Sequence, residues 1–167
     1  MLLTESILFL GACSDQQGDT SSPKPFSKKC WNLLARCKSR DLTGMITTHS
    51  FIKLWDLFYN ATPDNYGFHQ WEFSKRLFSL TESPLTLLTP TIEDLRSVVG
   101  LTESFPWTFG NLMDQAVVLA CALRSTAEKI TVVTADKVYW EQIDALKELL
   151  KSDRVEIRKP NDIGKMD

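Results

Sequence analysis

Two aspartates in the second half of the chain have the positions of a carboxylate pair at one edge of a parallel sheet. Asp114 opens a nearly all-apolar stretch that predicts a buried helix, and Asp136 ends the β-branched run 129–134, which predicts a buried strand. Open α/β sheets bind ligands at the carboxyl ends of their strands, so both side chains are expected near one site. Mg²⁺ keeps most of its waters and takes one or two protein carboxylates. Asp114 and Asp136 are therefore candidate catalytic residues and metal ligands for a phosphoryl or phosphodiester reaction.

Each aspartate also has a structural explanation. An acid in the first turn of a helix interacts favourably with the helix dipole, and an aspartate at a strand end often caps the next helix. The chain has no Gly-rich phosphate loop and no G-x-S-x-G motif, so P-loop or Rossmann nucleotide binding and α/β-hydrolase chemistry lack support. Taken singly, each acid fits a structural role at least as well as a catalytic one.

The pattern of apolar runs predicts one α/β domain over residues 1–167, with a mainly parallel central sheet and helices on both faces. The expected strands are Ser6–Leu10, Met45–Thr48, Leu85–Leu88, 129–134 and Val155–Ile157. The expected helices cover 26–40, 49–60, 68–80, 91–100, 111–123 and 143–150. In this arrangement Gly11, Thr48 and Asp136 reach the same carboxyl edge, and Asp114 joins them from the start of its helix.

Charge and cysteine content restrict the partners and the compartment. The net charge is −2 and the pI is about 5.7, so polyanion binding would need a local basic patch. The helix expected at 26–40 carries five Lys or Arg residues, although a charged helix surface is more often simply solvated. The four cysteines form no C-x-x-C pair, and Cys30 and Cys37 lie two helical turns apart, too far for a disulfide. Reduced thiols in a cytoplasmic protein are the expectation.

The amino-terminal segment leaves one alternative open. Leu10-Gly11-Ala12-Cys13 matches the lipobox of bacterial lipoproteins, which would make the chain lipid-anchored through Cys13. Against this, no Lys or Arg precedes the apolar run, Glu5 interrupts it, and it is shorter than the roughly 7–15 apolar residues of a signal peptide. We expect no membrane segment, because none approaches about 20 apolar residues.

The arrangement of these segments resembles a PIN domain over nearly the whole chain. The resemblance is carried by five segments: the opening run 6–10, the strand and helix of 44–55, the Asp114 helix, Val132–Asp136, and Val155–Pro160. PIN domains are mostly Mg²⁺- or Mn²⁺-dependent ribonucleases, and many are toxins of toxin–antitoxin pairs. The resemblance implies that Asp114 and Asp136 are later acids of the site and that Thr134 is a supporting hydroxyl. It also implies RNA as substrate and an antitoxin or other protein as partner.

The first half of the chain departs from the PIN pattern. Gly11 stands where the first strand should deliver an aspartate, and Lys53 stands where the helix after the second strand should carry a glutamate. An ammonium entering the cluster could neutralise Asp114 and Asp136 in place of a cation. We therefore expect weakened or lost catalysis and a nucleic-acid-associated or protein-interaction role. The alternative is an active Mg²⁺- or Mn²⁺-dependent single-strand ribonuclease. The apolar, aromatic-rich helices at 49–80 predict a homodimer.

Overall fold

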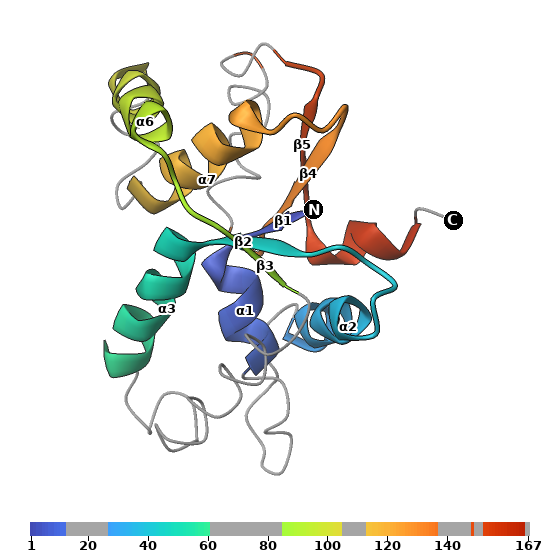
Figure 1. Ribbon diagram of the computed structural model, residues 1–167. Coiled ribbons are helices and arrows are strands. Elements are labelled where there is room, and N and C mark those ends of the chain that lie inside the picture. The colour runs from blue at the N-terminus through green and yellow to red at the C-terminus, as the bar shows by residue number, and fades with distance from the viewer. Residues whose placement is uncertain (13–26, 61–84, 105–112, 137–147, 149–151, 166–167) are drawn as a thin grey trace.

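The described part of the chain forms a five-stranded sheet in which every pair of neighbouring strands is parallel (Figure 1). A computed structural model of the protein describes residues 1–12, 27–60, 85–104, 113–136, 148 and 152–165. The strands are β1 (Leu2–Leu3), β2 (Met45–Thr47), β3 (Thr86–Leu88), β4 (Ile130–Val133) and β5 (Val155–Arg158). Their order across the sheet is β3-β2-β1-β4-β5, so β1 is central.

Helices cover both faces of the sheet. They are α1 (Glu5–Ala12), α2 (Ser27–Lys38), α3 (Thr48–Asn60), α6 (Ile92–Ser104) and α7 (Met113–Arg124), followed by the 3-10 helix η1 (Pro160–Lys165). Figure 1 shows α6 and α7 on one side of the sheet and α1 and α2 on the other. This arrangement confirms the predicted α/β fold with a parallel sheet.

Side chains that alternate along the strands build a separate core on each face. Leu2 and Val132 pack with α7, whereas their neighbours Leu3 and Val133 pack with α1 and α2. All four side chains are fully buried. Central parallel strands that are covered on both faces need apolar residues at every position, which explains the continuous β-branched run of β4.

The predicted first strand, Ser6–Leu10, is wrong, because these residues lie in helix α1. The strand that pairs with β2 and β4 is the shorter segment Leu2–Leu3. A run of four apolar residues does not distinguish a buried strand from a buried helix by its periodicity. Here Ile7 and Leu8 are buried and α1 packs against both α2 and α3, so the helix is surrounded on most sides.

The other predicted strands are confirmed, and so are the helices predicted at 26–40, 49–60 and 111–123. The helix expected at 91–100 begins as predicted but continues to Ser104, with Gly100 inside it. The helices expected at 68–80 and 143–150 lie outside the described residues, apart from Glu148.

An ion pair between the buried Asp94 and the exposed Arg124 joins α6 to α7. The Asp94 carboxylate, 2% exposed, accepts the single N–H of Arg124 Nε, which it shares between its two oxygens at 2.8 and 2.9 Å. It also accepts bonds from the backbone N–H and the hydroxyl of Thr91, at 2.7 and 3.0 Å, which closes the first turn of α6. Burial raises the pKa of Asp94, but the hydrogen bonds from Thr91 and Arg124 outweigh it, so the pKa lies below its ordinary value. The carboxylate is thus held in its charged form.

Cys30, Cys37 and Cys121 are buried free thiols, as predicted, whereas Cys13 lies outside the described residues. Within the ranges given above, no helix combines the length and the apolar character needed to cross a bilayer.

Candidate functional site

The carboxyl ends of β1 and β4 form the point where the direction of the sheet's connections reverses. From β1 the chain goes on to β2 and β3 on one side, and it then returns to β4 and β5 on the other. The connections that follow β1 and β4 therefore run to opposite sides of the sheet. Open parallel sheets typically bind their ligands at such a point, outside the carboxyl ends of the strands. The residues that follow these two strands, Thr4–Ser6 and Thr134–Asp136, are the candidate site.

Three hydroxyl groups, of Thr4, Ser6 and Thr134, are bonded together at this position, and we call them the hydroxyl cluster. Thr4 Oγ1 donates to Thr134 Oγ1 at 3.1 Å and lies 2.8 Å from Ser6 Oγ. Because the single proton of Thr4 is directed to Thr134, Ser6 is the donor in its bond to Thr4. Thr4 and Thr134 are 1% and 0% exposed. The cluster therefore links the carboxyl ends of β1 and β4.

The same hydroxyls hold the turn that carries Asp136. Ser6 Oγ accepts the backbone N–H of Ala135 at 3.1 Å, and Thr134 Oγ1 accepts the backbone N–H of Asp136 at 3.1 Å. The backbone N–H of Thr4 donates to Val133 O, also at 3.1 Å. These bonds fix the backbone of Asp136, whose side chain is half-buried at the edge of the sheet.

Helices α1, α3 and α7 meet around this edge. α1 begins directly after β1 with the half-buried Glu5, and α3 begins directly after β2. α3 packs against both α1 and α7. Because α7 leads back toward the amino end of β4 and is about 18 Å long, its first turn, which carries Asp114, lies toward the carboxyl edge. The side chain of Asp114 is outside the described residues.

Thr48 and Lys53 both lie on α3, which begins at the carboxyl end of β2. Thr48 is the first residue of that helix, and Lys53 lies five residues further on, with a half-buried side chain. The helix is capped by the preceding residue, since Thr47 Oγ1 accepts the backbone N–H of Ser50 at 2.9 Å and donates to its hydroxyl at 2.9 Å. Thr47 and Ser50 are both 0% exposed.

Gly11 does not lie at the carboxyl edge, which corrects the expected register. It lies in the last turn of α1, where a Cβ atom would collide with Leu34 Cδ1 of α2. The residue that directly follows the first strand is Thr4. The sequence did contain a signal for this position, because a Thr or Ser just before an acidic first turn is typical of a helix start.

The donors at this edge are mostly neutral. Hydroxyls can bind phosphate oxygens and water, but carboxylates are the stronger ligands for hard cations. Among the described side chains, which do not include that of Asp114, no group of three or more His, Cys, Asp or Glu residues could hold a metal ion. Glu5 and Asp136 are the described carboxylates that directly follow β1 and β4.

Comparison with known proteins identifies no relative: no protein-family model matches the chain, and no curated protein matches it.

Proposed function

We propose that the chain is a PIN-like domain related to metal-dependent ribonucleases, and that it binds nucleic acid with weak or no hydrolytic activity. The parallel sheet with helices on both faces is the fold that the resemblance implies. One observation carries the functional part. The residue that follows the central strand is Thr4, whose hydroxyl is bonded to Thr134, whereas an active site of this kind needs a carboxylate there.

Lys53 extends the same argument. The second acid expected of a PIN domain is replaced here by a cation on α3, the helix that packs against α7. An ammonium that reached Asp114 and Asp136 would neutralise them in place of a metal ion. The described residues thus provide a poor set of ligands for Mg²⁺ or Mn²⁺.

A second candidate, an active ribonuclease, is favoured by Glu5. This acid lies one residue after Thr4, in the first turn of α1, and is half-buried at the same edge as Asp136. In an active enzyme Glu5, Asp114 and Asp136 would hold the metal, which activates water for phosphodiester hydrolysis.

Cleavage of single-stranded RNA in the presence of Mn²⁺ distinguishes the two candidates. We expect the native chain to bind RNA without cleaving it, and the double variant Thr4→Asp, Lys53→Glu to gain metal-dependent cleavage. Asp41→Asn, which removes an exposed acid in the turn after α2, is the control. Cleavage by the native chain that is lost in Asp136→Asn but kept in Asp41→Asn would support the active enzyme instead.

The expected partners remain predictions. The homodimer was predicted from the helices at 49–80, and most of these residues lie outside those whose side chains the structure describes. Cys13, on which the lipid-anchored alternative depends, also lies outside the described residues. An antitoxin or other protein partner is a proposal that depends on the PIN resemblance. Native mass spectrometry of the purified chain would measure both the oligomeric state and any lipid on Cys13.

A further inference from the structure

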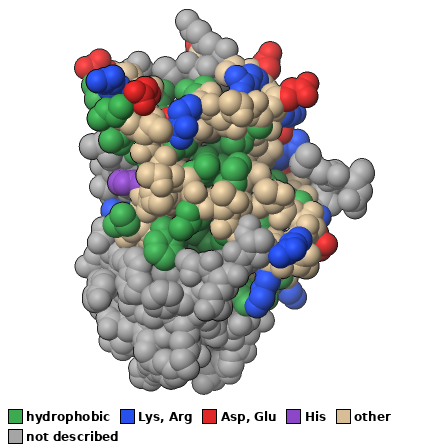
Figure 2. All heavy atoms as spheres, viewed as in Figure 1, with side chains coloured by type: hydrophobic (Ala, Val, Ile, Leu, Met, Phe, Trp, Pro, Cys, Tyr) green, Lys and Arg blue, Asp and Glu red, His purple; other side chains and the backbone are tan. Residues whose placement is uncertain are grey.

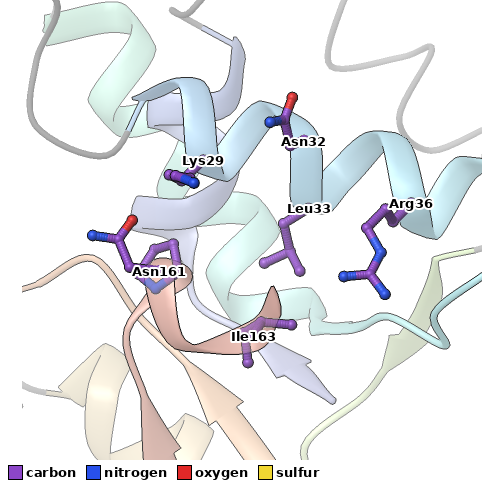
Figure 3. A pocket seen from close by; sticks show the side chains of 7 residues that line it. Lys29, Asn32, Leu33, Arg36, Asn161 and Ile163 are labelled. Carbon is purple, nitrogen blue, oxygen red and sulfur yellow. The ribbon is translucent and has the colours of Figure 1, made fainter. Parts of the chain in front are cut away.

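A pocket of about 200 Å³ lies between α2 and η1, on the face of the sheet that α1 and α2 cover (Figure 3). It shares no residue with the hydroxyl cluster. Its lining combines two cations, two amides and three apolar side chains: Lys29, Arg36, Asn32, Asn161, Leu33, Pro160 and Ile163. Figure 3 shows Leu33 and Arg36 extending from α2 toward η1.

The sequence of α2 explains why four of the lining residues share one face of the helix. The four lining residues of α2 follow the spacing i, i+3, i+4, i+7, which places them on one face of the helix. Leu33 of this face packs against Ile163 in the core, and they are 3% and 5% exposed. The two cations lie at either end of the row, roughly 10 Å apart along the helix axis. An anionic group placed between the two cations is attracted by both, while the rest of the ligand covers the apolar floor.

The charge of the pocket is uncompensated within the described part of the chain. Neither Asp nor Glu is among its described lining residues. In the described residues no hydrogen bond or ion pair engages the side-chain nitrogens of Lys29 or Arg36, although Arg36 is half-buried. The nearby Asp162 acts electrostatically on Arg158 and does not line the pocket. Figure 2 shows further Lys and Arg side chains gathered over α2, which has no acidic residue.

These features select the chemistry of the ligand. Arg and Lys together are typical ligands of phosphate, and the guanidinium can bind it through two parallel hydrogen bonds. Asn161 also lines the pocket, and its amide can both donate and accept, as the edges of a base or ribose require. The volume lies below the range of about 300–1,000 Å³ that is typical of sites for drug-sized ligands, so the pocket suits a ligand that stays partly exposed.

We infer that this pocket binds a single nucleotide through its phosphate, either as a free mononucleotide or as one unit of a strand. The phosphate lies between Lys29 and Arg36, and the nucleoside lies on Leu33, Pro160 and Ile163. Nucleotide binding in this pocket does not depend on whether the edge of the sheet at the hydroxyl cluster binds a metal ion. The inference about the pocket and the proposed loss of the metal site can therefore fail independently of each other.

Calorimetric titration with uridine 5′-monophosphate tests the inference. We expect the native chain to bind it with a Kd on the order of 1 mM or tighter, to bind uridine at least tenfold more weakly, and to lose affinity as salt is added. Arg36→Gln and Lys29→Gln should each weaken binding at least tenfold, because each removes a charge-assisted hydrogen bond. Lys28→Gln makes the same change of charge on an exposed α2 residue outside the pocket and should bind as the native chain does.

Three outcomes would overturn the inference: no binding of the monophosphate at about 1 mM, equal binding of uridine, or the same loss of affinity in Lys28→Gln as in Lys29→Gln. Lys29 is exposed, so its variant keeps the fold even if that of Arg36 does not. Comparing the affinities of a short uridine oligonucleotide and of the monophosphate then identifies the source of the phosphate. The oligonucleotide should bind more tightly than the monophosphate only if neighbouring nucleotides of the strand also contact α2.

Discussion

Replacement of Gly11 by alanine should destabilise the protein, although the same change inside a helix is normally favourable. The new methyl group would collide with Leu34 Cδ1, and it would approach the Cys30 backbone to 3.4 Å. The contact with Cys30 is an ordinary van der Waals distance, but Leu34 is 2% exposed, so its side chain must shift within a packed core to make room. Overpacking of this kind costs about 1–3 kcal/mol, whereas the gain in helix propensity is about 1 kcal/mol. The net loss is therefore expected to lie between about 0 and 2 kcal/mol.

Gly100 provides a matched comparison, because it also lies inside a helix. An added Cβ atom there meets nothing within 4 Å, so Gly100→Ala should raise the free energy of unfolding by up to about 1 kcal/mol. The two variants should thus differ by about 2 kcal/mol, or roughly 4–8 °C in Tm. Urea and thermal unfolding followed by circular dichroism measure this difference. Gly11→Ala would be as stable as Gly100→Ala if Gly11 lay at an open sheet edge, and that result would refute the position of β1.

Three further predictions concern the buried polar groups and the end of α2. Asp94→Asn should cost roughly 2 kcal/mol at neutral pH, because it weakens the bonds to Arg124. The pKa of Asp94 in the folded protein lies below its unfolded value of about 3.9. The difference in stability between the native chain and Asp94→Asn should therefore vanish as the pH falls through the folded pKa, and urea unfolding at a series of pH values measures it. Burial raises the pKa of Cys30 to about 12 and that of Cys121 to about 11, so peptide mapping should find iodoacetamide on them only after unfolding. Arg40 follows α2 with a φ of 66°, and Arg40→Gly should stabilise the fold by about 0.5 kcal/mol in urea unfolding.

The sequence was sufficient to predict the elements whose local pattern and burial agree. The long apolar stretch of α7 favours a buried helix and the β-branched run of β4 favours a buried strand, and both are buried as predicted. It was not sufficient for β1, which has only two residues. The register of β1 depends on its pairing with Met45–Ile46 and Val132–Val133, which no local pattern contains.

The candidate site could be predicted from the sequence only in part, for the same reason. Asp136 could be placed at the carboxyl edge because it directly follows a clear strand. Thr4 and Thr134 are 130 residues apart in sequence, and their hydrogen bond depends on β1 and β4 being neighbours in the sheet. The basic face of α2 was expected to be simply solvated, and only the packing of η1 against it forms a pocket there.

Calorimetric titration of Mn²⁺ into the native chain and into the double variant Thr4→Asp, Lys53→Glu tests the central claim most directly. The double variant restores a carboxylate after β1 and removes the cation on α3. We predict that the native chain shows no tight, stoichiometric binding and that the variant gains one bound ion, which is lost again when Asp136→Asn is added. Tight binding of Mn²⁺ by the native chain that Asp136→Asn abolishes would contradict the proposal that this site has lost its metal.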